Sequence, residues 1–217
     1  MSNTVIKRIR PLLFALAIGL VPAISATSVS AAKLDATQQE ALSGINKYFN
    51  SVRTMEGDFV QFGPNGERAE GQFFISRPGK VRFFYKPPSR INIVADGKSV
   101  SVFDRKLRTQ DIWPLGKTPL RFLVADSIDL QKNSNVQRVE VESDLVTVVI
   151  EEKSTFGKGK LTLVFDAKTK ELKQWTITDA QGLDTSVAIY NVTVGKPANA
   201  KNFKINYALS RNKRLTE

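Results

Sequence analysis

The sequence predicts a mainly β protein built on one antiparallel sheet that is strongly curved or barrel-like. Short runs of β-branched and aromatic residues follow one another along most of the chain, and turn residues separate them about every 8–12 residues. Only two segments of the chain after residue 32 show helical spacing. No linker or internal repeat divides residues 33–217, so we expect them to form a single domain.

Residues 1–32 have the pattern of a cleaved export signal. Lys7, Arg8 and Arg10 precede an apolar run over residues 11–24, which is shorter than a membrane span. Small residues follow, and we place cleavage after Ala32. We therefore expect an exported protein with a net charge of +8 once the three cations of the signal are removed.

The first helix is expected to begin at a capping box formed by Thr37 and Glu40. Apolar residues then recur on one helical face, at Leu42, Ile45, Phe49 and Val52. A helix with one apolar stripe needs an apolar surface to cover, and the strands that follow can supply it.

The strand runs follow the helix in an antiparallel meander. The dipeptide Asp96-Gly97 gives the strongest hairpin signal. In one run near the end of the chain, one face is apolar around Trp175 and Ile177. The expected strands are residues 55–62, 67–76, 80–86, 89–95, 99–104, 107–113, two within 137–152, 160–166, 171–180 and 185–194. The basic residues after 195 are expected to end in a loose segment or an edge strand.

A second, short helix interrupts the strands. It is expected to begin at Lys117 or Thr118, with Pro119 in its first turn and an apolar stripe at Leu120, Leu123 and Val124. One short helix inside a barrel-like sequence must either cover an opening of the barrel or pack outside it.

The amino-acid composition excludes several kinds of catalytic and metal-binding site. The chain has no Cys and no His, which excludes thiol and imidazole catalysis, disulfides and the usual zinc sites. Paired carboxylates at Glu140/Glu142 and Glu151/Glu152 leave a carboxylate-based periplasmic hydrolase as an alternative, although charges that alternate along a strand usually lie on a solvated face. We expect no cofactor and no nucleic-acid partner.

Aromatic residues gather in the first half of the predicted sheet, at Phe59, Phe62, Phe73, Phe74, Phe83, Phe84 and Tyr85. Val81, Phe83 and Tyr85 share one strand face, while Arg82 and Phe84 share the other. This pattern fits a packed core, and it equally fits the wall of an apolar ligand cavity.

Residues 71–125 carry a series of short motifs: G-x-F-x-x-x-RPGK-x-R-F-x-Y, V-x-DGK-x-V-x-x-FD, an I-W-x-L segment and TPLRFLVA, preceded by M-x-G-D-F-V-Q. In these motifs the segment resembles the family of periplasmic outer-membrane lipoprotein carriers (LolA-like). Beyond about residue 130 only the strand pattern matches. The chain departs from the family at Arg121, within the lid segment, and at its C-terminus, which lacks the usual Pro-rich end.

The resemblance implies an incomplete antiparallel barrel of about 11 strands with a helical lid, and a monomeric, non-enzymatic carrier. It would take acylated lipoproteins from an inner-membrane ABC-type release complex and pass them to an acceptor at the outer membrane. Arg77 would be the lid latch. An apolar pocket is expected between sheet and helices, lined by Leu42, Ile45, Phe49, Phe59, Phe74, Val81, Phe83, Tyr85, Ile93, Leu120, Phe122, Leu123, Val124, Trp175 and Ile177.

Two further alternatives share the half-barrel. One is a periplasmic lipid- or fatty-acid-binding or lipoprotein-sensing protein. The other is a lipid-anchored receptor, which the absence of Cys opposes because the acyl anchor is attached to Cys.

Overall fold

A computed structural model describes residues 34–132, 135–154 and 157–209, so the signal expected at residues 1–32 lies outside the described residues. In the described ranges eleven strands form one antiparallel sheet in the order β6-β5-β4-β3-β2-β1-β11-β10-β9-β8-β7, which confirms the predicted mainly β fold. The strands are β1 Thr54–Phe62, β2 Arg68–Ser76, β3 Lys80–Tyr85, β4 Ile91–Asp96, β5 Ser99–Asp104, β6 Thr109–Pro114, β7 Asn135–Val141, β8 Leu145–Ser154, β9 Gly157–Asp166, β10 Leu172–Thr178 and β11 Asp184–Val194.

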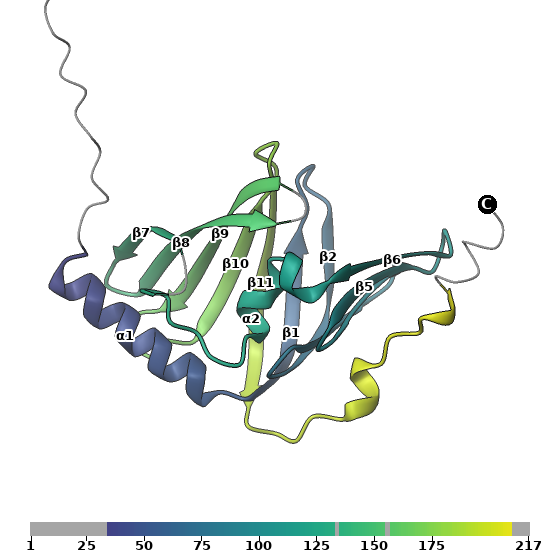
Figure 1. The fold of residues 1–217 in the computed structure, drawn as a ribbon, viewed down its shortest axis with the longest axis horizontal. Helices are drawn as coiled ribbons and strands as arrows, with labels where there is room; N and C mark the ends of the chain where they lie inside the picture. Colours follow the sequence, from purple (N-terminus) through teal and green to yellow (C-terminus); the bar gives the residue numbers. More distant parts are fainter. Residues whose placement is uncertain (1–33, 133–134, 155–156, 210–217) are drawn as a thin grey trace, which may run out of the picture. The chain divides into compact units, whose positions relative to one another are not determined.

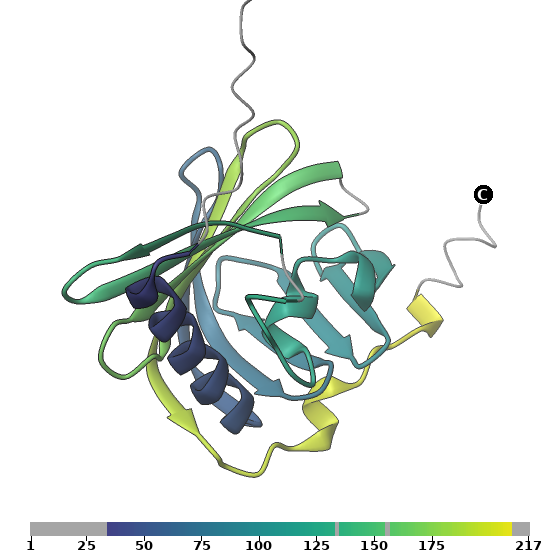
Figure 2. The ribbon, with the colours of Figure 1, turned by 60° about the vertical axis from the view of Figure 1, so that its left-hand side comes forward.

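The sheet is open, with β6 and β7 as its two edges. The first and last strands, β1 and β11, pair in its middle. Because β6 and β7 are consecutive in sequence but lie at opposite edges, the chain between them has to cross the hollow of the curved sheet. This connection carries the short helices η1 (Leu115–Lys117) and α2 (Leu120–Val124). Figures 1 and 2 show α2 and the long helix α1 on the same, concave side of the sheet.

Helix α1 spans Ala36–Ser51. Its capping box lies two residues before the predicted one, so the prediction of Thr37 and Glu40 was wrong. The Asp35 carboxylate accepts from the Gln38 amide at 2.8 Å, and the Gln38 side chain accepts from the Asp35 amide at 3.0 Å. Asp is a stronger N-cap than Thr, which accounts for the earlier start.

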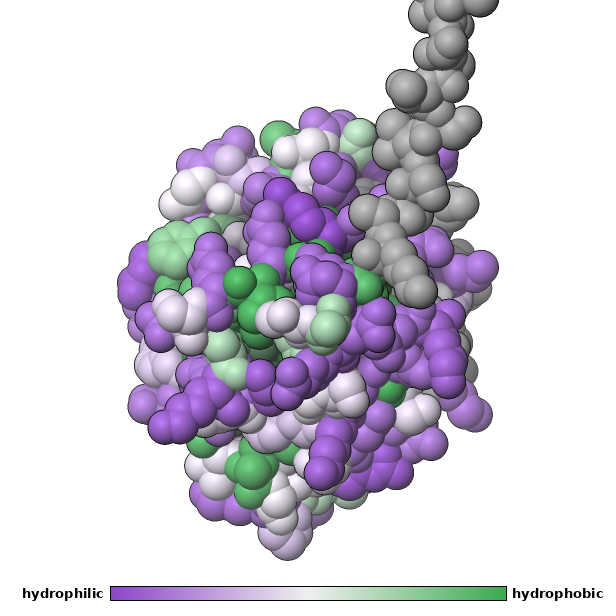
Figure 3. Space-filling model, turned by 90° about the vertical axis from the view of Figure 1, so that its left-hand side faces the viewer, coloured by the Kyte–Doolittle hydropathy of each residue, from purple (hydrophilic) through white to green (hydrophobic). Residues whose placement is uncertain are grey.

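The core lies between the concave face and the two helices. Leu42 and Ile45 of α1 have no exposed surface, and neither do Phe59 of β1 and Phe73 of β2. A side chain at Gly71 would collide with the sheet, since a Cβ there would lie 2.0 Å from the Phe84 carbonyl oxygen. The face in Figure 3 is largely hydrophilic, with apolar side chains visible only in small areas.

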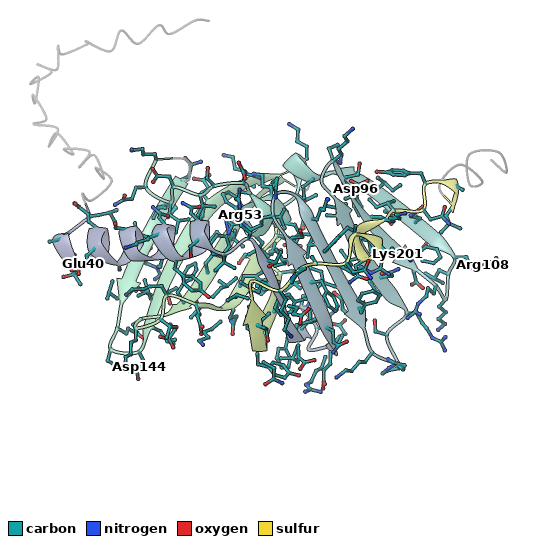
Figure 4. The ribbon with its side chains drawn as sticks, turned by 90° about the horizontal axis from the view of Figure 1, so that it is seen from below. Glu40, Arg53, Asp96, Arg108, Asp144 and Lys201 are labelled. Carbon is teal, nitrogen blue, oxygen red and sulfur yellow. The ribbon has the colours of Figure 1, made fainter. Side chains whose placement is uncertain are left out.

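The C-terminal segment up to residue 209 crosses the convex face of the sheet (Figures 1 and 4), and the expected loose or edge-strand ending lies outside the described residues. It carries the short helix η2 (Ala200–Phe203), which contacts β3 and β4 and whose Phe203 is buried. The Tyr207 hydroxyl donates to the Asp96 carboxylate at 2.7 Å. Figure 4 labels Asp96 and Lys201, which lies in the C-terminal segment. Among the described residues, no helix is both long and apolar enough to span a membrane.

Candidate functional site

The concave face and the two helices bring together most of the predicted cavity residues in one apolar cluster. These residues come from α1, α2 and strands on both sides of the β1–β11 pair, so distant parts of the sequence meet here. Nine of the predicted residues are buried: Leu42, Ile45, Phe49, Phe59, Val81, Phe83, Leu123, Val124 and Trp175.

Among the described residues, the predicted apolar pocket does not reach the centre of this cluster, where the side chains pack against one another. Leu42, Ile45, Phe59 and Val81 each have 0% exposed surface, which means that no water-sized void touches them. A small space of about 10 Å³ remains near Phe49 and Arg77. The helices therefore fill the hollow of the sheet with their own side chains, and a ligand can occupy it only by displacing them.

Five further predicted residues are half-buried and pack around the edge of the cluster: Tyr85, Ile93, Leu120, Phe122 and Ile177. The Tyr85 ring meets Phe59 edge-on at 5.0 Å, and its hydroxyl donates to Gln61 at 2.7 Å. Burial raises the pKa of Tyr85, so its hydroxyl stays protonated near neutral pH. This rim is apolar with one neutral polar group.

The assignment of Phe74 to the concave face was wrong. Phe73 is the buried residue, whereas Phe74 stacks edge-on against Phe84 at 5.8 Å on the convex face. Strand alternation sends neighbouring residues to opposite faces. The buried positions Gly71 and Ile75, two residues before and after Phe73, are the sequence signal that could have placed Phe73 inside.

Arg77 lies where the two helices meet the sheet. Its Nε donates to the carbonyl of Ala125, the C-cap of α2, at 2.9 Å. Its Nη1 donates to the carbonyls of Phe49 and, at 3.0 Å, of Val52, at the end of α1. One side chain therefore pins the last turns of both helices, where carbonyls lack partners within the helix. The resemblance implied a latch role for Arg77 toward the lid, and the sequence gave no sign of the contacts with α1.

Burying the charged guanidinium of Arg77 where the helices meet the sheet costs free energy. Arg77 is only 8% exposed, and burial together with the nearby Arg53 lowers its pKa to about 10, while Asp126 opposes the shift. Nη2 is buried and has no hydrogen-bond partner among the described residues. The free-energy cost of this unsatisfied buried donor offsets part of the stabilisation from the other Arg77 hydrogen bonds. The closed arrangement of the helices on the sheet is therefore only moderately stable.

A separate pocket of about 380 Å³ lies beside α2. Phe122 and Val124 of α2, the Pro78-Gly79 turn and the residues after α2 line it. The Gly79 amide donates to the Val124 carbonyl at 2.7 Å, which is a second link between the sheet and the end of α2.

Of the carboxylates singled out for a hydrolase, Glu140, Glu142 and Glu151 lie at the surface near the β7 edge, whereas the side chain of Glu152 lies outside the described residues. Glu140 forms an ion pair with Arg138 at 3.1 Å, and Glu151 accepts from Gln137 at 3.3 Å. Each is paired with a neighbouring side chain, an arrangement typical of a solvated strand face. Within the described ranges, no group of three or more Asp or Glu could hold a metal ion.

Residues 50–206 match the model of a protein family described as outer membrane lipoprotein carrier protein LolA. The chain belongs to the LolA family. A relative named outer-membrane lipoprotein carrier protein, from Chromobacterium violaceum, is 26% identical over 178 residues, which cover 77% of this chain and 84% of the relative. Another of that name, from Methylococcus capsulatus, is 26% identical over 171 residues, covering 75% and 81%.

Solved structures with a similar fold include a LolA superfamily protein from Nitrosomonas europaea. It is 11% identical, with a TM-score of 0.42, and the match covers 77% of this chain and 99% of that one. The crystal structure of MucB is also similar, at 13% identity and a TM-score of 0.46, covering 80% of this chain and 64% of that one.

Proposed function

We propose that this LolA-family protein is a periplasmic carrier. It binds the acyl chains of lipoproteins released from the inner membrane and delivers them to the outer membrane. The export signal expected at residues 1–32 supports a location in the compartment between the two membranes.

The observation that carries this proposal is the Arg77 pin over an apolar concave face. The face offers aliphatic and aromatic side chains from α1, α2 and the sheet, and the contact that closes it is made to backbone carbonyls. Exposed acyl chains cost about 0.8 kcal/mol per CH₂ in water, so a water-soluble carrier needs such a face.

Closure by the protein's own side chains makes binding moderate and reversible. Acyl chains entering the hollow must displace the packed Leu42, Ile45 and Leu123 and break the Arg77 bonds. Charge-assisted hydrogen bonds contribute roughly 1.5–3 kcal/mol each, and their return favours release of the cargo. The empty, closed state therefore competes with the lipid-bound state, as a carrier requires.

The proposed partners follow from this role. An inner-membrane ABC-type complex would supply the lipoprotein, and a receptor or the membrane itself would accept it. The net charge of +8 expected after removal of the signal suits contact with acidic partner surfaces or anionic head groups.

Native mass spectrometry tests the proposal. The mature protein is incubated with inner-membrane vesicles that contain a triacylated lipoprotein and the release complex, and the soluble fraction is then weighed. We expect a one-to-one complex of this chain with the intact lipoprotein. A soluble fraction that holds only free chain, or chain with free fatty acid, contradicts the carrier proposal; the second result favours the fatty-acid-binding alternative.

A further inference from the structure

The convex face of the sheet carries a half-buried arginine, Arg82 of β3. It lies between Val81 and Phe83, which are buried in the core, so strand alternation puts it on the opposite face. Its guanidinium carbon lies 4.2 Å from the centre of the Phe84 ring. The Phe84 ring in turn meets Phe74 edge-on at 5.8 Å. This aromatic pair therefore holds the guanidinium in one place on the convex face.

The hydrogen bonds of Arg82 are incomplete. Its Nε is buried and has no hydrogen-bond partner among the described residues. Its Nη1 donates to the Asn202 carbonyl at 3.5 Å, which is long for a hydrogen bond. Asn202 belongs to η2, in the C-terminal segment that lies over this part of the sheet (Figure 4). Buried donors in folded proteins nearly always have a partner, so Arg82 can gain free energy from an incoming acceptor.

A second arginine lies beside the first. Burial lowers the pKa of Arg82, and the positive charge of Arg105, in the turn after β5, lowers it further. The Arg105 side chain is held in place, since its Nε donates to the Arg90 carbonyl at 3.3 Å. In the described ranges, neither Arg82 nor Arg105 forms an ion pair with a carboxylate. An anion between the two guanidinium groups would remove their repulsion.

We propose that Arg82 and Arg105 form a binding site for a phosphate group on the convex face of the sheet. Arginine suits phosphate because its planar guanidinium donates two parallel hydrogen bonds. A phosphate monoester carries a charge of about −1.5 to −2 at pH 7, which balances two arginines, whereas a carboxylate balances only one. The inference goes beyond the carrier function, because it concerns the face of the sheet opposite to the apolar cluster.

An NMR titration of the mature protein with inorganic phosphate tests the site. Sodium phosphate replaces sodium chloride at constant ionic strength, so the screening of charges does not change. We expect a saturable shift of the Arg82 Nε–H signal, whose buried position slows its exchange with water. Free phosphate and a lipid head group share the same phosphate chemistry, so the absence of a saturable shift overturns the proposal.

Two variants decide whether both arginines bind the phosphate. Arg105→Gln removes an exposed cation and should weaken phosphate binding at least about tenfold, as expected for the loss of a charge-assisted hydrogen bond. Arg82→Lys keeps the charge but loses the planar guanidinium, and should also weaken binding, measured at the Phe84 backbone amide. Wild-type affinity in either variant overturns the site.

Lys168→Gln is the matched control. Lys168 is an exposed cation on the β9–β10 turn, so this change lowers the net charge by the same amount as Arg105→Gln. It should leave the affinity for phosphate unchanged. Equal weakening by the two variants would overturn the site, because the phosphate would then respond only to the overall charge of the protein.

Vesicles identify the source of the phosphate group. The mature protein is sedimented with phosphatidylcholine vesicles that contain phosphatidic acid, whose head group is a phosphate monoester. Binding that Arg105→Gln weakens and Lys168→Gln does not would assign the site to a lipid head group. Absence of such binding, together with a saturable shift in the titration, would assign it to free phosphate. The carrier proposal does not depend on these results, since its site lies on the concave face.

Discussion

The guanidinium of Arg77 lies 4.4 Å from the centre of the Phe49 ring, and its Nη1 donates to the carbonyl of the same residue. Phe49 is the last buried residue of α1. One residue therefore receives both a cation–π contact and a charge-assisted hydrogen bond, and both are lost if the end of α1 moves away from the sheet.

Arg77→Leu should accept lipoprotein but hand it on poorly. Without the pin, the closed state loses bonds to three backbone carbonyls and no longer competes with bound lipid. Loss of even one such bond corresponds to roughly a tenfold slower transfer, and Arg77→Lys should fall between Leu and the wild type. A release-and-transfer assay measures both steps.

The matched control is Arg138→Leu. Arg138 also has a partner, but it pairs with Glu140 at the surface near the β7 edge. Its replacement should leave transfer near the wild-type rate. Wild-type transfer by Arg77→Leu would remove Arg77 from the mechanism and leave only the apolar face.

Alanine substitutions of the neighbours Phe73 and Phe74 should have very different effects on stability and on affinity for an acylated probe. Phe73→Ala empties a fully buried site on the concave face and should lower the free energy of unfolding by about 3–5 kcal/mol, together with the affinity for an acylated probe. Phe74→Ala removes a half-buried ring from the convex face and should cost less and leave affinity unchanged. Urea unfolding and probe titration check both. Equal loss of affinity would contradict the assignment of faces.

Much of the fold was predictable because its signals are local. Turn residues such as Asp96-Gly97 marked the strand boundaries, and the observed strands agree with the predicted ones within a few residues. The short helix begins at Leu120 after Pro119, as its sequence indicated. Such features depend only on backbone preferences and side-chain periodicity.

Other features of the structure come from effects that periodicity does not carry. Leu172 and Trp175 are both buried although they are three residues apart on a strand, because an irregular pairing between Leu172 and Gln174 shifts the alternation. Whether an apolar face is filled or hollow depends on packing in three dimensions. The sequence therefore did not predict that helix side chains fill the hollow of the sheet. The hydrogen bonds from the Leu130 and Ile128 amides to Asn46 and Asn50 join residues about 80 positions apart, and no local sequence pattern predicts them.

The attachment of the C-terminal segment should depend on pH. Burial of the Asp96 carboxylate raises its pKa, but the amides of Ser99 and Lys98 and the Tyr207 hydroxyl together outweigh that effect and hold the pKa below its ordinary value. A carboxylate with a lowered folded-state pKa contributes stability above its unfolded pKa of about 3.9, and this contribution is lost as pH falls through the folded-state value.

Tyr207→Phe removes one of these bonds. We expect it to lower the free energy of unfolding by roughly 0.2–1 kcal/mol at pH 7, a range that allows for solvent screening of this exposed pair. The difference from the wild type should shrink as pH falls through the folded-state pKa of Asp96. Urea unfolding between pH 2 and 7 measures it, and other carboxylates cancel in the subtraction. A difference that is constant with pH would show that Asp96 is not the partner that matters.

The basic surface should accelerate transfer. If exposed cations such as Lys86 and Arg90 steer the protein to acidic partners or anionic head groups, the transfer rate falls as added salt shortens the Debye length from about 10 Å at 0.1 M to about 3 Å at 1 M. The double variant Lys86→Gln, Arg90→Gln should show a shallower salt dependence, whereas Lys168→Gln, an exposed cation on the β9–β10 turn, should not. A transfer rate independent of salt would mean that the charge serves solubility alone.

Depletion of this protein in the cell that encodes it tests the carrier role most directly. Membranes are separated after depletion, and the lipoproteins of each are quantified. Lipoproteins destined for the outer membrane should accumulate in the inner membrane, and the wild-type chain should restore their distribution whereas Arg77→Leu should restore it poorly. An unchanged distribution after full depletion would contradict the carrier function.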